Sequence, residues 1–263
     1  MSLEVTHLDK WFDARRSNVA QHVLRDVDVS IEPGEFVSLI GHSGCGKSTL
    51  LNVIAGLLDP DGGAVTVDGE PITDPGPDRA IVFQNYSLLP RLSLFDNVTV
   101  AVRSARRDES REWADEHAER YLRAVGLWAH RDKRPNEVSG GMQQRTAVAR
   151  AFAVEPRILL LDEPFGALDA LTRARLQQQL IDLWQSESTT ETVVMVTHGI
   201  EEAIFLADRI LVMSGPPGPS VLEDIRVPLA RPRDRAMMID DPAYRDVYDR
   251  LVALLSEQSV DAA

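Results

Sequence analysis

Apolar residues along this chain follow patterns that predict alternating strands and helices. Val27–Ile31 alternates apolar and polar positions, and Phe36–Ile40 is an almost continuous apolar run. A run of that kind predicts a strand buried on both faces. The spacing then becomes helical at Leu50, Val53, Ile54, Leu57 and Leu58. This part of the chain therefore predicts a strand, a glycine-rich loop and a helix.

The middle third of the chain, about residues 87–153, has a helical character. Residues 108–125 are rich in charge, with opposite charges four positions apart at Glu116/Arg120 and Glu119/Arg123, a spacing that supports a solvated helix face. Gln143–Val154 predicts a second helix of small and apolar residues. We expect an inserted α-helical subdomain here.

Strands and helices alternate again in the last third. The predicted strands, including two from the first third, are Val65–Val67, Arg79–Phe83, Arg157–Leu161, Thr192–Thr197 and Arg209–Met213. The predicted helices are Leu171–Trp184 and Glu201–Ala207, and a final helix covers Pro242–Ser256. Strands that alternate with helices predict an α/β fold with a mostly parallel sheet flanked by helices.

The charge balance narrows the function classes. The chain has 263 residues, with 28 Lys and Arg against 41 Asp and Glu, which gives a formal net charge of −13. A nucleic-acid binder needs a basic footprint, so we expect no nucleic-acid partner. The one cysteine, Cys45, cannot form an internal disulfide, and a reducing compartment fits it. We find neither a signal peptide nor an apolar run of the ~18–20 residues that span a bilayer, and expect a soluble chain.

The segment after the apolar strand fits the phosphate-loop pattern G-x-x-x-x-G-K-[ST]. Its residues are Gly41, His42, Ser43, Gly44, Cys45, Gly46, Lys47 and Ser48. Glycines let consecutive backbone N–H groups turn toward one anion, and the helix that follows adds the positive end of its dipole. Lys47 would reach the β- and γ-phosphates of a nucleotide, Ser48 would coordinate Mg²⁺, and Thr49 would add an α-phosphate contact. An ordinary glycine turn is the alternative, and the strand before and helix after favour the phosphate loop.

Two acids end a predicted buried strand more than a hundred residues later. Asp162 and Glu163 follow Ile158–Leu161, and adjacent side chains on a strand point in opposite directions. Asp162 would approach Mg²⁺, while Glu163 would polarise the water that attacks the γ-phosphate. The alternative is a strand that ends in solvated acids, which a phosphate loop in the same chain disfavours.

A third motif carries a resemblance to a known family. Residues 138–145, Val-Ser-Gly-Gly-Met-Gln-Gln-Arg, resemble the Leu-Ser-Gly-Gly-Gln signature of the nucleotide-binding subunits of ATP-binding-cassette (ABC) transporters. Ser139 is a good helix N-cap, and Gly140 and Gly141 expose backbone N–H groups at a helix start. The resemblance implies a head-to-tail dimer in which this motif faces the ATP bound by the other subunit.

The same resemblance implies roles for four more residues. Phe12 would stack on adenine, with Trp11 as the rival candidate; burial of both aromatic side chains in the core is the alternative. Gln84 would contact Mg²⁺ and the attacking water, Asp169 would make a dimer contact, and His198 would contact the γ-phosphate. Four other histidines match no motif of the family, and we expect them at the surface: His7, His22, His117 and His130.

The resemblance covers about residues 2–225 and implies a P-loop NTPase fold. The expected parts are a RecA-like, mostly parallel sheet with flanking helices, an antiparallel β subdomain and the inserted helical subdomain. We therefore expect an ABC ATPase domain over 1–225 and a C-terminal extension with a final helix over 226–263. Because Cys45 lies in the phosphate loop, a bulky thiol reagent is expected to block ATP binding, and ATP is expected to protect the thiol.

Several stretches resemble the ATPases of nitrate-type importers, among them residues 41–45, 75–79, 82–90 and 231–235. Related importers serve nitrite, cyanate, bicarbonate, or taurine and other sulfonates, and Arg91 replaces the tryptophan usual in this type. Implied partners are ATP with Mg²⁺, a second ATPase subunit (an identical copy or a paralogue), transmembrane permease subunits and a separate substrate-binding protein. Such a subunit works at the cytoplasmic face of the cell membrane. The alternatives are a non-transport ABC ATPase, a non-hydrolysing scaffold module and a P-loop kinase.

Overall fold

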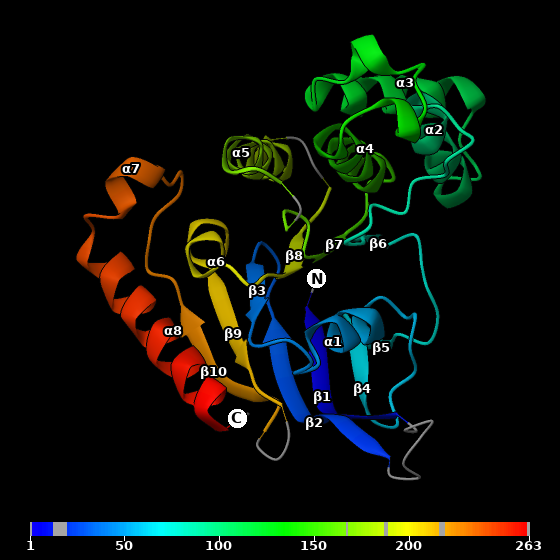
Figure 1. Ribbon diagram of the computed structural model, residues 1–263. Coiled ribbons are helices and arrows are strands. Elements are labelled where there is room, and N and C mark those ends of the chain that lie inside the picture. The colour runs from blue at the N-terminus through cyan, green and yellow to red at the C-terminus, as the bar shows by residue number, and fades with distance from the viewer. Residues whose placement is uncertain (1, 13–19, 167, 187–188, 216–218, 262–263) are drawn as a thin grey trace. The chain divides into compact units, whose positions relative to one another are not determined.

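The computed structural model describes residues 2–12, 20–166, 168–186, 189–215 and 219–261 (Figure 1). The chain divides into two compact units. One comprises Met1–Pro75 together with Thr192–Ala263, and the other comprises Gly76–Glu191.

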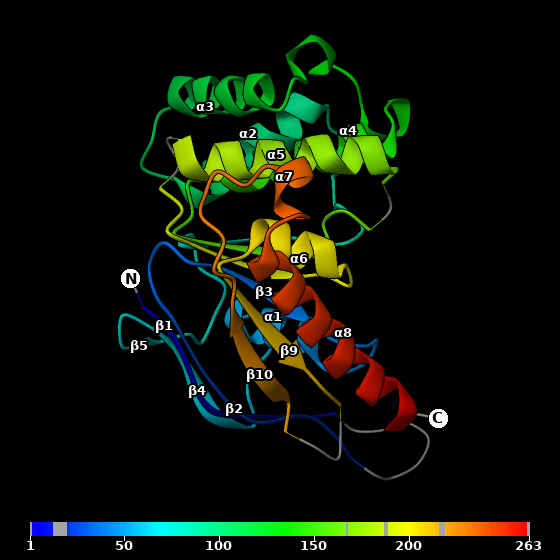
Figure 2. The ribbon, with the colours of Figure 1, turned by 90° about the vertical axis from the view of Figure 1, so that its left-hand side faces the viewer.

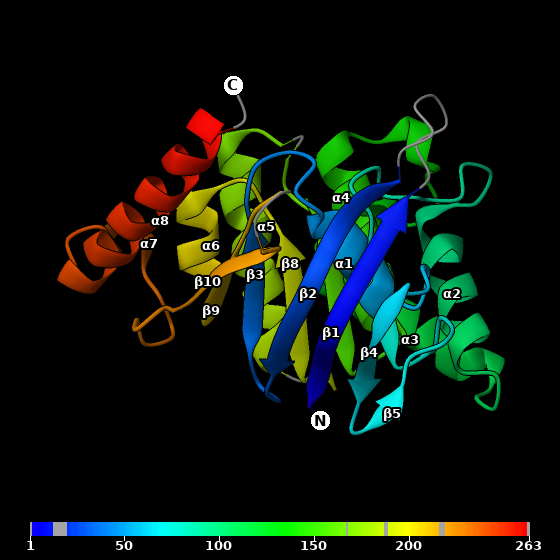
Figure 3. The same ribbon diagram turned by 90° about the horizontal axis from the view of Figure 1, so that it is seen from below.

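The first unit contains a four-stranded antiparallel sheet, which Figure 3 shows with its strands side by side. Its strands, in the order β2-β1-β4-β5, are Gln21–Ile31, Leu3–Phe12, Gly62–Val67 and Glu70–Pro71. Leu3 pairs with Ile31 on one side and with Val67 on the other. The expected antiparallel β subdomain is confirmed.

The same unit also holds the strand that ends in the glycine-rich loop. Strand β3 (Phe36–Ile40) runs parallel to β8 (Thr192–Val196) on one side and to β9 (Arg209–Met213) on the other. All five residues of β3 are buried, as the apolar run predicts. An antiparallel strand, β10 (Val221–Arg226), pairs with β9. The helices of this unit are α1 (Lys47–Ile54), α6 (Ile200–Leu206), α7 (Arg235–Met238) and α8 (Pro242–Asp261).

The second unit contains a parallel strand pair and the helices α2, α3, α4 and α5, which Figure 2 labels. The strands are β6 (Arg79–Val82) and β7 (Ile158–Asp162), and the helices are α2 (Leu94–Ala105), α3 (Arg111–Ala124), α4 (Gly140–Ala153) and α5 (Ala170–Ser186). Two short 3₁₀ turns, Trp128–His130 and Pro135–Glu137, lie between α3 and α4. A serine caps the N-terminus of three of these helices, because the side-chain oxygen accepts an otherwise unpaired N–H group. These caps are Ser93, Ser110 and Ser139.

Two sequence expectations are wrong in detail. Helix α1 ends at Ile54 and does not continue to Leu58, because Gly56 adopts a left-handed φ of 72° that terminates the helix. His22 and His117 are half-buried and not surface residues. His22 pairs with Asp9 and stacks on Trp11, and His117 pairs with Glu155 and stacks on Trp113. In contrast, the predicted Glu119–Arg123 ion pair is present.

Among the residues that the structure describes, none of the helices is sufficiently long and apolar to cross a bilayer.

The fully buried Asn97 side chain generates a prediction about stability. Its carboxamide accepts the N–H of Leu89 at 2.7 Å and donates to the carbonyl oxygens of Leu89 at 3.1 Å and Ser93 at 2.8 Å. Asn97→Ala leaves these backbone groups without their partner, so we expect the free energy of unfolding to fall by about 2–3 kcal/mol. Urea denaturation followed by circular dichroism measures this. The exposed Asn136→Ala is the matched control, and an equal effect of both substitutions would contradict the prediction.

Candidate functional site

The predicted phosphate loop connects the buried end of β3 to the start of α1. Gly44 and Gly46 adopt left-handed φ values of 84° and 103°, which residues with a Cβ atom avoid. Gly41 is needed for a different reason, since a Cβ there would lie 2.3 Å from the carbonyl oxygen of Met213. The loop thus packs closely against the end of β9. Gly44 and Gly46 are required by their backbone conformation, and Gly41 is required because a side chain would not fit there.

Lys47, the first residue of α1, folds back over the loop. Its Nζ donates to the carbonyl oxygens of Gly41 at 2.8 Å and His42 at 2.9 Å, and its side chain is buried. The ammonium charge is therefore held beside the loop. Ser48 is exposed at the next position, and Thr49 is half-buried.

His198 lies at the same edge of the sheet as the phosphate loop. It follows β8, and the register pairs Leu39 of β3 with Val196 of β8. The N–H of Thr197 continues this ladder by donating to the carbonyl oxygen of Leu39 at 3.1 Å. Because parallel strands end at one edge, the exposed His198 and Gly41 both emerge at the carboxyl ends of neighbouring strands.

In the second unit, Gln84 and Glu163 are in direct contact. β6 and β7 are parallel neighbours, with Val82 opposite Leu161, so the residues that follow them lie together. The Gln84 carboxamide donates to Oε2 of Glu163 at 3.0 Å. Asp162, the last residue of β7, directly precedes Glu163 in the chain and is half-buried.

Glu163 has an unusual backbone conformation. Its φ is 47°, in the left-handed region that costs a non-glycine residue about 1–3 kcal/mol. Such strain is found where the position of a side chain matters, and here it accompanies the contact with Gln84. The carboxylate is therefore oriented by its own backbone and by a neighbouring amide.

The signature motif forms the exposed N-terminus of α4. Ser139 is the N-cap, and its hydroxyl oxygen accepts the N–H of Met142 at 3.4 Å. Gly140 is exposed, while a Cβ at Gly141 would lie 2.9 Å from Cγ2 of Thr172. The first glycine leaves the helix end open, and the second permits close packing against α5. A helix start of this kind offers N–H groups to an anion.

Asp169 caps α5. Its carboxylate accepts the N–H of Thr172 at 3.0 Å, and the hydrogen bonds from Thr172 lower the pKa of Asp169. The side chain is exposed, so the predicted dimer contact stays a prediction. Ala167, in the same stretch, lies outside the described residues.

The two N-terminal aromatic side chains are exposed, so their expected alternative as core residues is wrong. Trp11 is 45% exposed and Phe12 is 39% exposed. Trp11 stacks on His22, with a centroid separation of 3.7 Å and an interplanar angle of 7°. Lys10 lies over the Phe12 ring, 5.6 Å from its centroid. The choice between Phe12 and Trp11 for adenine stays open.

The expectation for Cys45 needs correction. Its side chain is 0% exposed, and burial raises the pKa of its thiol. The Sγ atom lies 3.7 Å from Nζ of Lys47, on the inner side of the loop. The thiol is therefore packed into the protein, and a bulky reagent cannot report directly on ATP occupancy.

The structure thus brings the predicted residues together in two sets. The phosphate loop and His198 share one strand edge of the first unit, and Gln84 contacts Glu163 in the second. Sequence reasoning missed Arg150, which donates to the carbonyl oxygens of Tyr86 at 2.9 Å and Ser87 at 2.7 Å. Both residues have left-handed φ values, of 63° and 45°, and nothing in the sequence marks such a turn.

Comparison with known proteins gives close relatives. Residues 24–166 match the family described as ABC transporter. The nitrate import ATP-binding protein NrtD of Synechococcus elongatus is 49% identical over 225 residues, 84% of this chain and 80% of that protein. The bicarbonate transport ATP-binding protein CmpD of Synechocystis sp. is 47% identical over 222 residues, 84% and 78% of the two chains.

A solved structure gives the same architecture. The ATP-binding cassette MJ0796, in a dimeric post-hydrolysis state bound to ADP and Pi, matches with a TM-score of 0.75 at 32% identity. The match covers 87% of this chain and 100% of that chain. The expected P-loop NTPase fold is confirmed.

The burial of Cys45 predicts a slow thiol. In the native chain we expect a chromogenic disulfide to react about 100-fold more slowly than in urea, because burial restricts access and raises the thiol pKa. The native rate should still be rising with pH beyond the pKa of an ordinary thiol. The matched control is Ser43→Cys combined with Cys45→Ser, which places the thiol at an exposed position of the same loop. Equal rates for both chains would contradict the prediction.

Proposed function

The chain belongs to the ABC transporter family, as its motifs predict, and we propose on this premise that it is the motor subunit of an importer for nitrate or nitrite. It is an ABC-type ATPase that binds and hydrolyses ATP. It works with a second ATPase subunit and with permease subunits. The choice of nitrate rests on one observation: the chain is 49% identical to a nitrate import ATP-binding protein along most of both chains.

Bicarbonate is the second candidate solute. The bicarbonate transport relative is 47% identical, only slightly less than the nitrate relative. Both solutes are small planar monoanions, so related permeases could be adapted to either. The nitrate-like stretches of this sequence, including the Arg231–Arg235 segment, favour nitrate.

We assign the hydrolytic roles from the geometry of each unit. The phosphate loop and the start of α1 would hold the β- and γ-phosphates, with Lys47 supplying the charge. Glu163, oriented by Gln84, would accept the proton of the attacking water. His198 would donate to the γ-phosphate from the end of β8. These roles suit a reaction in which positioning and charge supply most of the catalysis.

Mg²⁺ fits the oxygen donors that the chain offers. A serine hydroxyl at Ser48, a carboxylate at Asp162 and an amide oxygen at Gln84 are hard ligands of the kind that Mg²⁺ prefers. When bound, the ion would neutralise negative charge on the β- and γ-phosphates. We propose these three side chains as its protein ligands.

The exposed start of α4 supports a head-to-tail dimer. Ser139 and Gly140 present a helix N-terminus to solvent, and Asp169 is exposed beside the start of α5. In the proposed dimer, the α4 end of one copy faces the ATP held by the phosphate loop of the other. The second copy is either an identical chain or a paralogue.

A groove of the second unit supports a permease docking site. It has a volume of about 290 Å³ and lies between β6, α2 and α4. Its lining is mostly apolar and includes the exposed side chains of Leu89 and Val100. A short cytoplasmic segment of the permease would dock there, next to the turn that follows Gln84, and would hold the chain at the cytoplasmic face. A separate substrate-binding protein would deliver the anion.

The proposed role of Glu163 predicts that its substitution traps the chain as an ATP-bound dimer. Glu163→Gln removes the proton acceptor, so we expect kcat for ATP hydrolysis to fall by about 10²–10⁴-fold. Because nucleotide binding persists, the variant with ATP should elute as a stable dimer in gel filtration. Glu109→Gln, an exposed acid of the same unit, is the control. Turnover like that of the native chain in Glu163→Gln would refute the role of Glu163.

The proposed solute predicts a specific stimulation. In proteoliposomes that contain this chain, its permease and its binding protein, nitrate should raise the ATPase rate, whereas bicarbonate and taurine should not. Phosphate release measures the rate, with a matched chloride salt as the control. Stimulation by bicarbonate alone would overturn the nitrate proposal and leave the ATPase assignment intact.

A further inference from the structure

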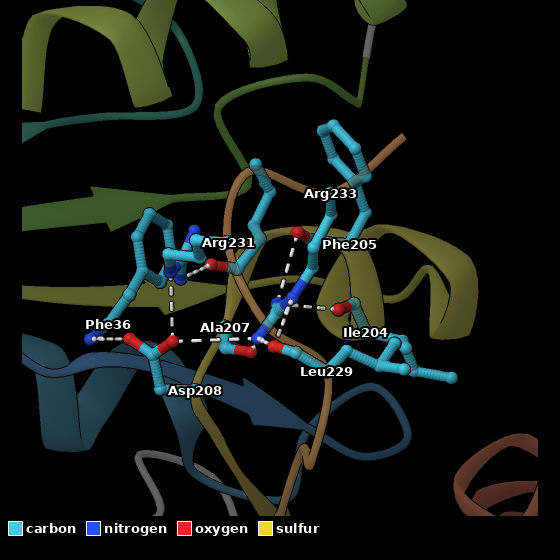
Figure 4. A network of polar contacts seen from close by, with 9 residues as sticks. Phe36, Ile204, Phe205, Ala207, Asp208, Leu229, Arg231 and Arg233 are labelled. Carbon is cyan, nitrogen blue, oxygen red and sulfur yellow. Dashed lines mark hydrogen bonds and ion pairs between the residues drawn. The ribbon is translucent and has the colours of Figure 1, made fainter. Parts of the chain in front are cut away.

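Two arginines from the C-terminal part of the chain bind the end of helix α6 (Figure 4). Arg233 donates to three carbonyl oxygens there, at 2.8, 3.1 and 2.7 Å, and Arg231 donates to a fourth. In chain order, the four acceptors are Ile204, Phe205, Leu206 (bound by Arg231) and Ala207. Two side chains thus cover four consecutive carbonyl groups.

These contacts satisfy a requirement that α6 cannot meet alone. The last four carbonyl groups of a helix have no partner within it, and cations near this end are stabilised by the helix dipole. The Arg233 side chain is only 3% exposed. Burial and the neighbouring Arg231 charge lower the pKa of Arg233 to about 10, so it still carries its charge at neutral pH. A buried charge of this kind needs a dense set of acceptors, and the helix end supplies it.

Asp208 joins this cluster to the strand that leads to the phosphate loop. Its Oδ1 accepts from Nε of Arg231 at 2.9 Å, and its Oδ2 accepts the N–H of Phe36 at 2.9 Å (Figure 4). Phe36 is the first residue of β3. The two arginines therefore fasten the end of α6 to the beginning of β3.

The other end of α6 leads directly to His198. Gly199 is the N-cap of α6, and Thr197 braces this turn by accepting the N–H of Gly199 at 3.0 Å and donating to Glu202. Any shift of the two-turn helix along or about its axis would move these residues. His198 lies between them in the chain, so its position depends on where α6 is held.

Further C-terminal contacts run along the same helix. The Arg235 guanidinium lies 3.7 Å from the centroid of the Phe205 ring. Helix α8 packs against α6, and the charge of Glu201 contributes, after burial, to the raised pKa of Tyr244. The C-terminal segment thus packs against α6 through both Arg235 and α8.

We propose that Arg231 and Arg233 are positioning residues for ATP hydrolysis, which act by holding α6 so that His198 reaches the γ-phosphate. The inference rests on the proposed role of His198. It assigns to the C-terminal segment a part in catalysis, although both arginines contact the end of α6 opposite to His198.

A double-mutant cycle tests this in the full-length chain. We expect Arg233→Gln to lower kcat about tenfold with KM for ATP within about twofold, because the nucleotide is bound mainly by the phosphate loop. In the His198→Ala background the same substitution should change kcat by less than about twofold, since the residue it positions is gone. Arg250→Gln removes an exposed ion pair of α8 with Glu223 and is the matched control, expected to keep native turnover.

Hydrogen exchange supplies a readout beside activity. The amides of residues 200–206 should exchange faster in Arg233→Gln, whereas those of α1 should not. If Arg233→Gln does not fold, Arg231→Gln, which removes one carbonyl contact and the ion pair with Asp208, undergoes the same tests. If Arg233→Gln folds, Arg233→Lys should have a kcat between those of Arg233→Gln and the native chain, because it keeps the charge.

The outcomes separate this inference from the proposed function. Equal losses of kcat from Arg233→Gln in both backgrounds, or native kcat and exchange in Arg233→Gln, would overturn the positioning role and leave the ATPase assignment standing. If His198→Ala hydrolyses ATP at the native rate, the role of His198 in the proposed function is itself wrong, and the inference fails with it.

Discussion

The position of the phosphate loop depends on how tightly the end of β3 is held. The strand is buried along its whole length between β8 and β9, and at its end Gly41 lies against the carbonyl oxygen of Met213, with no space for a side chain. Because interiors are close-packed, a loop confined in this way takes its position from the neighbouring strands. The end of β8 then carries His198 to the same edge. The register of three strands therefore decides what a bound phosphate would meet.

The net charge of the chain does not describe the charge near the phosphate loop and the helix starts. The chain as a whole has a net charge of −13, yet Lys47 and the starts of α1 and α4 offer positive charge or N–H groups. Two carboxylates, those of Asp162 and Glu163, lie at the end of the buried strand β7, in the unit that also contains α4. The overall acidity thus describes the solvated surface and opposes nucleic-acid binding, but it does not describe the phosphate site. Local geometry, not net charge, determines which anion binds.

Much of this arrangement could be predicted because strong local patterns encode it. Apolar runs mark β3, β7 and β8, and the glycine spacing marks the phosphate loop. Strand β10 could not be predicted because it lies at a sheet edge and carries charged residues at both half-buried and exposed positions. The inward position of Cys45 could not be predicted either, since the motif fixes the backbone of the loop and not the direction of a variable side chain. Similarly, the carboxylate partners of His22 and His117 lie 13 and 38 positions away in the sequence.

The arginine cluster shows why long-range contacts escape sequence reasoning and still control a site. Helix α6 has seven residues, and a helix of that length is marginal unless tertiary contacts hold it. The side chains of residues 203–206 are buried, but apolar packing alone tolerates small shifts along the axis, whereas hydrogen bonds to four consecutive carbonyl groups do not. The sequence shows a basic run at residues 231–235 that resembles nitrate-type importer ATPases, and nothing in it indicates that these arginines bind α6. Its buried contacts make the C-terminal segment part of the framework that holds the end of β8 beside the phosphate loop.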